Sequence, residues 1–445
     1  MTDVIIIGAG PGGFDTAIYA KEKGLDVTLI EKDTVGGTCL NWGCIPTKAL
    51  YHNAKKIKDM SELDVFGINA PSFTIDQEII KIRKETIVEN QVRNIHTSLD
   101  KLGVNLLKGE ATIISPNKVE VNGLILDTKH IIIATGSIPK KLRFEGDDLE
   151  IVHDSKDLLS LETFPKRMLV VGAGVIGSEM ASIFTAFDCE VTLVEYLDDV
   201  LPMQDKDIKK RAKNLFKRKG IQIKTSTALK KLTFSDGKYI ASLEGKRKTE
   251  EVETDYILLS TGRVPFYGNL DLEGLGIAYT PQGITVNEYK QTTIPTIYAI
   301  GDVNGEMMLA HKATYDGYKA INHILGEEFA VDFNLVPSVV FSFPEIASVG
   351  VTEDMVTGEY ETNKFLYKTN AKAECMNETD GFIKLIIDDQ RKLIGCHIIG
   401  AHASDLIHEA TLALHQNMSI DEYQTMIHAH PTISEVLGEC IKGFK

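Results

Sequence analysis

The chain has 445 residues, of which 43% are hydrophobic and 25% charged, and its formal net charge at pH 7 is −15. This length suits roughly three domains of ~150 residues. The negative charge argues against nucleic acid or an anionic membrane surface as a partner. The start of the chain has no basic and apolar signal segment, and no stretch reaches the ~18 uncharged apolar residues that a membrane span needs. We therefore expect a cytoplasmic protein.

The first predicted element is the strand Val4–Ile7, which leads into a glycine-rich turn and a helical stretch. A second strand, Val27–Ile30, ends in Glu31. The glycines of the turn are Gly8, Gly10, Gly12 and Gly13. Glycines let the backbone approach a pyrophosphate, the helix N-terminus offers free N–H groups, and the carboxylate binds ribose hydroxyls. The segment therefore predicts a βαβ dinucleotide unit.

The same pattern occurs a second time, from the strand Met168–Val171 to the strand Val191–Val194 and Glu195. Its turn contains Gly172, Gly174, Val175, Ile176 and Gly177. As many residues separate Gly172 from Glu195 as separate Gly8 from Glu31. One glycine motif is a weak signal, but two complete units with equal spacing predict two nucleotide sites.

The residues after Glu195 indicate which nucleotide the second unit prefers. The segment Tyr196-Leu197-Asp198-Asp199 contains no Arg or Lys. A 2′-phosphate would lie against Glu195 with no cation to neutralise it. The second unit therefore predicts NAD rather than NADP.

Several segments between and after the two strand–helix–strand units carry further predictions. A stripe of mostly apolar residues within Phe73–Leu102 predicts a long helix packed on the core: Ile79, Ile82, Thr86, Val88, Val92, Ile95 and Leu99. The strand-like run Ile131–Ala134 precedes Thr135 and Gly136, and Tyr256–Ser260 likewise precedes Gly262. In both places we expect the backbone to lie close to a nucleotide.

The pattern changes from about Leu335 onward. The predicted strands are Val339–Phe341, Phe382–Ile387 and Leu393–Ile399. Helices are predicted near Ser404–Gln416 and Ser419–Met426, the second opened by a capping box from Ser419 to Glu422. Strands followed by helices, without a dinucleotide signature, predict a separate α+β domain.

Two of the six cysteines, Cys39 and Cys44, lie close together, while the other four are isolated. In a reducing compartment we expect the isolated ones to be buried small hydrophobes: Cys189, Cys375, Cys396 and Cys440. The close pair straddles the first turns of a helix, where the N-terminus lowers a thiol pKa. A zinc site would need a second close pair, so we predict no metal. Two unlinked buried thiols remain the alternative to a redox pair.

The position of the cysteine pair suggests how the two nucleotide sites divide their roles. Cys39 follows Glu31 closely, so the pair is built onto the first unit. A nicotinamide delivers a hydride and does not readily attack a disulfide, whereas a flavin between them solves this problem. We therefore expect FAD in the first unit and NAD in the second.

The string GGTCLNWGCIPTKAL from Gly36 resembles the active-site segment of the pyridine nucleotide-disulfide oxidoreductases. The resemblance extends along the chain through Ala134–Gly136, Ala299–Asp302, Leu309–Lys312 and His428–Glu435. It implies an α/β fold with two Rossmann-like dinucleotide-binding domains and a C-terminal α+β dimerisation domain. The implied segments are 1–143 and 266–334 for FAD, 144–265 for NAD and 335–445 for dimerisation.

The resemblance also implies catalytic roles. Cys44 is the thiol nearest the flavin, able to form a charge-transfer thiolate, and Cys39 is the thiol that exchanges with substrate sulfur. Lys48 and Glu179 match an ion pair beside the flavin. His430, oriented by Glu435, is the acid–base group, and the resemblance places it on the partner subunit of a homodimer.

The residues that the resemblance assigns to the cofactors fall into two sets. Those for FAD, besides the first glycine turn and Glu31, are Lys32, Gly37, Thr38, Lys48, Gly109, Ala111, Thr135, Gly136, Asp302, Leu309, Ala310 and His311. Those for NAD, besides the second turn and Glu195, are Ala228, Gly262 and Arg263. Phe266 stands where relatives often carry Asn.

Within the family, the C-terminal string and Val194–Asp198 most resemble members that oxidise a dihydrolipoyl group. That group would be carried by another protein of a 2-oxo acid dehydrogenase or glycine-cleavage complex. Reduction of a glutathione-like disulfide by NAD(P)H is the alternative within the class, and Glu195 disfavours it. Mercuric reduction is disfavoured because the tail has a single cysteine, Cys440. A docking subunit without catalysis would not need the cysteine pair or the histidine.

Overall fold

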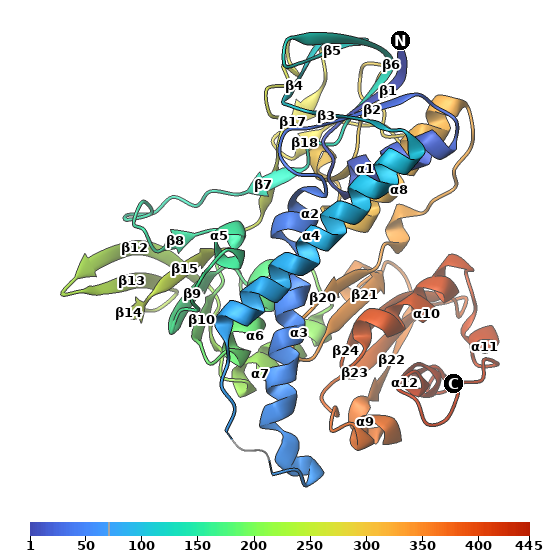
Figure 1. Ribbon diagram of the computed structural model, residues 1–445. Helices are drawn as coiled ribbons and strands as arrows, with labels where there is room; N and C mark the ends of the chain where they lie inside the picture. Colours follow the sequence, from blue (N-terminus) through green and yellow to red (C-terminus); the bar gives the residue numbers. More distant parts are fainter. Residues whose placement is uncertain (70–71) are drawn as a thin grey trace. The chain divides into compact units, whose positions relative to one another are not determined.

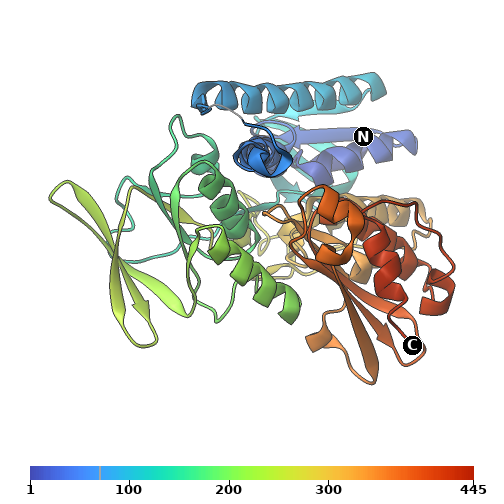
Figure 2. The same ribbon diagram turned by 90° about the horizontal axis from the view of Figure 1, so that it is seen from below.

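The computed structural model describes residues 1–69 and 72–445 (Figures 1 and 2). These residues divide into two compact units. The first comprises Met1–Ala49, Glu78–Lys140 and Gly262–Val331, and the second Leu50–Gln77, Lys141–Thr261 and Asp332–Lys445.

The first unit is built on a seven-stranded sheet in the order β3-β2-β1-β6-β5-β4, with β19 also paired to β6. Its strands are β1 (Thr2–Ile7), β2 (Val27–Glu31), β3 (Asn105–Lys108), β4 (Ala111–Ser115), β5 (Lys118–Val121), β6 (Leu124–Ile133) and β19 (Ile297–Ala299). β1 runs parallel to both β2 and β6, so the chain leaves β1 between two parallel neighbours. Such a switch point in strand order is where α/β sheets bind nucleotides.

Alternate residues of this sheet face two separate cores. Val4 and Ile6 pack with residues of three helices, which are α1 (Pro11–Glu22), α4 (Gln77–Leu102) and α8 (Ala310–Leu325). Ile5 and Ile7 pack on the opposite face against β4 and β5. Both faces of the central strand are covered, which explains why Val4–Ile7 is a continuous apolar run. Short strand pairs complete the unit: β7 (Ser137–Pro139) with β16 (Arg263–Pro265), and β17 (Tyr279–Thr280) with β18 (Gly283–Ile284).

The prediction that the whole apolar stripe of α4 packs on the core is wrong for the first half of the helix. Ile79 and Ile82 are 59% and 49% exposed. Within the stripe, the packed residues are Leu99 and the partly buried Val92 and Ile95. The first half of α4 instead buries Ile80 and Lys84, which lie outside the stripe, so helical spacing identified the buried face correctly only for the second half.

The second unit contains a five-stranded parallel sheet in the order β11-β10-β9-β15-β8. Its strands are β8 (Val152–His153), β9 (Arg167–Val171), β10 (Glu190–Val194), β11 (Gln222–Lys224) and β15 (Tyr256–Leu259). Helices α5 (Ser155–Leu159), α6 (Val175–Ala186) and α7 (Lys206–Arg218) belong to this part. A three-stranded antiparallel sheet joins β12 (Thr227–Ser235), β13 (Lys238–Gly245) and β14 (Thr249–Thr254).

The C-terminal part of the second unit is an antiparallel five-stranded sheet in the order β20-β21-β24-β23-β22. Its strands are β20 (Ser338–Val340), β21 (Ile346–Gly350), β22 (Tyr360–Leu366), β23 (Phe382–Asp388) and β24 (Leu393–Ile399). The helices are α9 (Ala371–Cys375), α10 (Ala403–His415), α11 (Ile420–Tyr423) and α12 (Glu435–Ile441). The predicted capping box is present, because Ser419 and Glu422 bond each other's backbone N–H.

The predicted fold class is confirmed: two Rossmann-like sheets are followed by an α+β part that has strands first and helices after. Among the described residues, no helix combines the length and the apolar character needed to cross a membrane. Cys189, Cys396 and Cys440 are buried as predicted, whereas Cys375 is exposed, so that expectation is wrong for Cys375.

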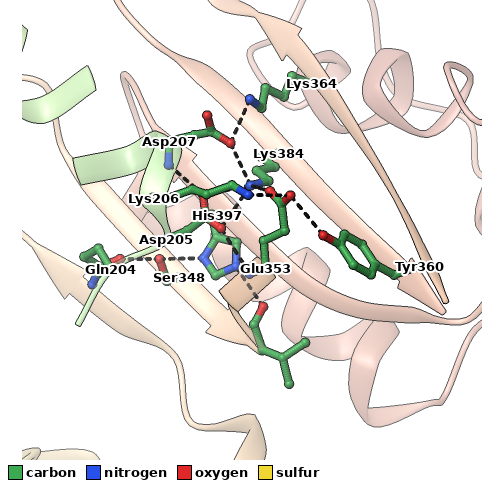
Figure 3. Close-up of polar contacts among 11 residues, drawn as sticks. Gln204, Asp205, Lys206, Asp207, Ser348, Glu353, Tyr360, Lys364, Lys384 and His397 are labelled. Atoms are coloured by element: carbon green, nitrogen blue, oxygen red, sulfur yellow. Dashed lines mark hydrogen bonds and ion pairs between the residues drawn. The ribbon is translucent and has the colours of Figure 1, made fainter. Parts of the chain in front are cut away.

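A fully buried lysine, Lys384 on β23, holds part of the second unit together (Figure 3). Its ammonium lies 2.9 Å from Asp205 Oδ1, 2.7 Å from Asp207 Oδ2 and 2.5 Å from Glu353 Oε2. Asp205 caps the N-terminus of α7 by accepting the Asp207 N–H. One buried cation therefore ties the start of α7 to the C-terminal sheet.

Two outer lysines and a buried histidine surround this cluster (Figure 3). Lys206 and Lys364 pair with Glu353 and Asp207, each at 2.7 Å. His397 contacts Ser348 Oγ and Val351 O through its two ring nitrogens. Burial opposes ionisation of the three carboxyls, but the hydrogen bonds to lysine outweigh it and lower the pKa of Asp205, Asp207 and Glu353. Burial likewise opposes the charge on Lys384, but its carboxylate partners raise its pKa.

We expect Lys384→Met to lower stability by about 3–5 kcal/mol at pH 7, because it leaves three carboxylates without their buried cation. Carboxyls whose pKa is lowered in the folded state stabilise it above their unfolded pKa, and lose that contribution on acidification. Because these pKa values lie below the ordinary carboxyl values of 3.8 and 4.5, the difference from the parent protein should hold from pH 7 to about pH 5 and shrink between about pH 5 and pH 3. Thermal unfolding over this pH range measures it. Lys364→Met, at a 41% exposed side chain, is the control and should cost below about 1 kcal/mol. Equal losses in the two variants would contradict the assigned role.

Candidate active site

The first glycine turn is fixed by backbone contacts at the ends of three strands. Gly8 has φ +103 and donates its N–H to Ile30 O at 2.8 Å. A Cβ on Gly8 would lie 2.4 Å from Ala134 O, at the end of β6. The next N–H, of Ala9, donates to Glu31 Oε2 at 2.7 Å. Glycine is required at position 8 by both conformation and space.

The second turn repeats these contacts in the second unit. Gly172 has φ +105 and donates to Val194 O at 2.8 Å, and its Cβ would lie 2.5 Å from Ser260 O. Ala173 N–H donates to Glu195 Oε2 at 2.6 Å. Each carboxylate accepts one further backbone N–H, from Asp33 in the first unit and Leu197 in the second. The predicted duplication therefore extends to individual hydrogen bonds.

One glycine in each turn is not explained by the fold itself. Gly10 and Gly174 have ordinary φ values of −68 and −73. Among the described residues, no non-neighbouring atom lies within 4 Å of a Cβ built at either glycine. Each is the N-cap of a 12-residue helix, α1 or α6, that has no side-chain cap. Open space beside uncapped helix N–H groups fits the pyrophosphate of a dinucleotide at both turns.

We expect Gly10→Ala to fold normally but to lower the affinity for FAD about tenfold or more, because the methyl group occupies only the nucleotide's space. The ratio of flavin to protein absorbance after purification, and titration of the apoprotein with FAD, measure this effect. Gly174→Ala is the matched control: it should retain FAD and lose affinity for NAD instead. Equal flavin content in both variants and the parent would contradict the placement of FAD at the first turn.

The predicted cysteine pair spans two helices rather than one. Cys39 lies in α2 (Gly37–Trp42) and Cys44 is the first residue of α3 (Cys44–Ser61). Gly43 separates them, and a Cβ there would lie 2.8 Å from Thr38 O. Both cysteines are free thiols. The break brings two residues that are five apart in sequence to within hydrogen-bonding distance of each other.

The two thiols are not equivalent. A hydrogen bond to Cys44, together with burial, raises the pKa of the Cys39 thiol. The expectation that the helix N-terminus lowers the pKa is therefore wrong for Cys39. Cys44 opens α3, so its sulfur lies at the N-terminal end of that helix.

Asp302, the residue assigned to the ribityl chain of FAD, is held in place by Ser137. Ser137 Oγ donates to Asp302 Oδ2 at 2.5 Å and accepts from Arg263 Nε at 2.7 Å. Arg263 also donates to Ser137 O. Ser137 was missed from the sequence, because nothing in its local pattern separates it from any turn serine. It links Asp302 to Arg263, two residues that the sequence assigned to different cofactors.

The other residues predicted for FAD all lie in the first unit. Gly109 N–H donates to Glu31 O at 2.9 Å, and Ala111 is buried beside it. Thr135 Oγ1 donates to Phe266 O, and Lys32 Nζ lies 4.1 Å from the centre of the Phe266 ring. The remaining predicted positions are Gly37 and Thr38 at the start of α2, Gly136 with φ +72, and Leu309, Ala310 and His311 at the start of α8.

The predicted ion-pair residues are divided between the units. Lys48 is on α3 in the first unit. Glu179 is on α6 in the second unit, where it is 5% exposed and accepts the Phe341 N–H at 2.9 Å. The NAD residue Ala228 is also in the second unit, whereas Gly262 and Arg263 lie in the first.

His430 and Glu435 form the predicted couple near the C-terminus. His430 Nδ1 lies 3.0 Å from Glu435 Oε1, and the imidazole is 74% exposed. Hydrogen bonds from the Thr432 N–H and from His430 lower the pKa of Glu435. The carboxylate therefore stays ionised near neutral pH and holds the imidazole through Nδ1.

A second histidine nearby, His428, makes a structural contact in the C-terminal part. His428 Nε2 contacts Glu409 Oε1 at 2.9 Å, and the Tyr423 hydroxyl donates to the same oxygen. The His428 side chain is only 7% exposed. Its buried environment distinguishes it from His430, two residues further along the chain.

Comparison with known families identifies the chain. A family model described as Pyridine nucleotide-disulphide oxidoreductase matches residues 2–317, and a model for the dimerisation domain of the same family matches residues 336–441. The chain belongs to the pyridine nucleotide-disulphide oxidoreductases. The predicted family and the dimerisation-type C-terminal domain are therefore confirmed.

Curated relatives match along nearly the whole chain. Dihydrolipoyl dehydrogenase 2, mitochondrial, of Arabidopsis thaliana is 38% identical, covering 98% of this chain and 89% of the relative. Dihydrolipoyl dehydrogenase of Bacillus subtilis is 34% identical, with 98% and 97% covered. Leghemoglobin reductase of Glycine max is 37% identical, with 98% and 86% covered.

Two solved structures are similar over the full fold. LpdA from Mycobacterium tuberculosis has a TM-score of 0.91 at 25% identity, with 99% of each chain covered. The HOCl-induced flavoprotein disulfide reductase RclA from Escherichia coli has a TM-score of 0.89 at 26% identity, with 100% of each chain covered. The protein is thus a flavoprotein disulfide oxidoreductase whose cofactors are FAD and NAD, as predicted.

Proposed function

We propose that this protein is a dihydrolipoyl dehydrogenase, which oxidises protein-bound dihydrolipoamide to lipoamide and reduces NAD⁺ to NADH with release of one proton. The observation that carries the proposal is the cysteine pair: Cys39 and Cys44 lie within hydrogen-bonding distance of each other, on a segment whose Gly37 lies beside Gly10 of the turn that fits FAD. The identity of 34–38% to curated dihydrolipoyl dehydrogenases supports this substrate.

The proposed reaction begins with Cys39 and Cys44 joined as a disulfide. A substrate thiolate attacks the sulfur of Cys39, which forms a mixed disulfide and releases Cys44 as a thiolate. The second substrate thiol then attacks the substrate sulfur that is bonded to Cys39. The bond to Cys39 breaks, lipoamide is released and Cys39 is left reduced. When bound, FAD supplies a two-electron acceptor between the cysteine pair and NAD⁺.

His430, oriented by the ionised Glu435, accepts the proton of each substrate thiol in turn. One of these protons is released to solvent, and the other accompanies the electron pair to NAD⁺. In the proposed homodimer, each cysteine pair works with His430 of the partner subunit. The dimerisation-domain match at 336–441, which contains His430 and Glu435, supports this arrangement. The lipoyl group would be presented by another protein, of a 2-oxo acid dehydrogenase or glycine-cleavage complex.

The proposed compartment is the cytoplasm. The reaction needs a cysteine pair that returns to the dithiol form in every cycle, and isolated cysteines without disulfide partners are usual in a reducing compartment. Glu195, 8% exposed and committed to backbone N–H groups of its own turn, supports NAD as the physiological nucleotide.

The decisive measurement is steady-state turnover with dihydrolipoamide and NAD⁺ against turnover with glutathione disulfide and NADPH. We expect kcat/KM for the first pair to exceed that for the second by about a thousandfold or more. Faster turnover with glutathione disulfide would replace the proposal with a glutathione-type reductase. If protein that retains FAD turns over neither pair, the proposed enzyme function is wrong and the alternative of a docking subunit without catalysis replaces it.

A further inference from the structure

A pocket of about 400 Å³ opens beside the ribose-binding carboxylate of the second unit. It is lined by Tyr196, Ser226, Ala228, Lys230, Glu244, Gly245 and Lys246. Backbone bonds attach it to Glu195: Thr227 N–H donates to Glu195 O at 2.9 Å and Ser226 N–H to Leu197 O at 2.8 Å. The exposed ring of Tyr196, directly after Glu195, offers a flat apolar surface to a base. The pocket is therefore placed to receive the adenosine end of a dinucleotide.

The pocket holds two lysines that the sequence around Glu195 did not reveal. Lys246 Nζ lies 2.7 Å from Asp198 Oδ1, and the same oxygen accepts a hydrogen bond from Ser226 Oγ at 2.5 Å. Lys230 Nζ lies 2.9 Å from Glu244 Oε2. Each lysine thus has a carboxylate partner, and the two pairs cancel in charge. Glu195 remains as the net negative charge of the site.

The two pairs differ in their distance from the ribose-binding end. Gly245 pairs with Thr227, the residue whose N–H is bonded to Glu195 O. Lys246 follows Gly245 directly, and its partner Asp198 lies three residues after Glu195. Lys230 lies three residues beyond Thr227 along β12, which corresponds to about 10 Å of extended chain. Of the two cations, Lys246 is the one close to where a 2′-phosphate would lie.

We infer that the Asp198–Lys246 pair is a specificity determinant of the second nucleotide site: Asp198 neutralises Lys246, the nearer of the two lysines in the pocket lining to where a 2′-phosphate would lie. This inference rests on the proposed assignment of the second unit to NAD. A 2′-phosphate carries about −1.5 to −2 charges at pH 7. A 2′-phosphate beside Glu195 needs a nearby cation to neutralise it. Lys246 could supply that charge, but it is paired with Asp198. The preference for NAD then has two sources, repulsion by Glu195 and masking of Lys246 by Asp198.

Binding of two fragments to the FAD-loaded protein tests the inference without turnover. The fragments are 5′-AMP and 2′,5′-ADP, which differ by the 2′-phosphate alone, and calorimetric titration gives the ratio of their affinities. We expect Asp198→Asn to shift this ratio toward 2′,5′-ADP by about five- to tenfold at low salt, and the shift to shrink at high salt because it is electrostatic. The double variant Asp198→Asn, Lys246→Met should return the ratio to the parent value.

The matched control is Glu244→Gln, which frees Lys230 in the same pocket and should shift the ratio by less than about twofold. A ratio that does not change in Asp198→Asn, or a shift that survives removal of Lys246, would overturn the inference. An equal shift in Glu244→Gln would also overturn it, because the effect would then be one of pocket charge in general. Turnover with dihydrolipoamide is measured separately, so failure of the proposed function is distinguishable from failure of this inference.

Discussion

Replacement of Cys44 by Ser is expected to abolish turnover with dihydrolipoamide and NAD⁺, by about 10⁴-fold or more. The variant cannot form the Cys39–Cys44 disulfide, so the substrate dithiol has no disulfide bond to attack. FAD should remain bound, because Cys44 is at the start of α3 and not in the glycine turn. Steady-state kinetics and the flavin content of the purified protein measure the two effects.

Cys39→Ser is the matched variant, and absorbance spectra separate it from Cys44→Ser. Both should be inactive. Because the proposed charge-transfer thiolate is Cys44, the Cys39→Ser protein should show the long-wavelength absorbance of a thiolate beside oxidised flavin, and the Cys44→Ser protein should not. A Cys44→Ser protein that keeps this absorbance would reverse the roles assigned to the two thiols.

His430→Gln is expected to lower kcat with dihydrolipoamide by about 10²–10⁴-fold, the range for removal of a general acid–base group. Glutamine keeps the size of the side chain and a polar end, but it does not accept a proton at neutral pH. Reduction of the flavin by NADH does not require thiol protons, so it should continue at close to the parent rate. Steady-state and stopped-flow measurements on the same preparation distinguish the two half-reactions.

His428→Gln is the control for this experiment, since it changes a histidine two residues away whose side chain is mostly buried and contacts Glu409. It should affect thermal stability more than turnover. Loss of dihydrolipoamide turnover in His428→Gln that equals the loss in His430→Gln would show that the segment matters as a whole. His430 would then lose its assignment as the base.

The nucleotide turns could be predicted in detail because their requirements are local. Gly8 and Gly172 need a positive φ and space beside the neighbouring strand, and Glu31 and Glu195 end strands that lead straight from those turns. Spacing along the chain therefore specifies the site. In the C-terminal part, local sequence predicted β20, β23, β24, α10 and α11, the last from the Ser419 capping box, whereas β21, β22, α9 and α12 were not predicted.

The features that could not be predicted depend on contacts between residues far apart in sequence. Asp198 forms an ion pair with Lys246, and Ser137 donates a hydrogen bond to Asp302. No local sequence pattern predicts either contact. The exposure of Ile79 and Ile82 is of the same kind, because a helix pattern does not show what covers it. The pKa of Cys39 was expected to fall and instead rises, because its nearest neighbour is the other thiol.

The buried Lys384 has a consequence for how the sequence can change over time. Its three carboxylate partners come from two separate segments, Asp205 and Asp207 from one and Glu353 from the other. An apolar replacement of the whole set would be stable, but each single replacement leaves an uncompensated charge in a dry environment. A series of substitutions that replaces these four residues one at a time therefore passes through destabilised variants. The four positions should therefore vary together or not at all among descendants of this sequence.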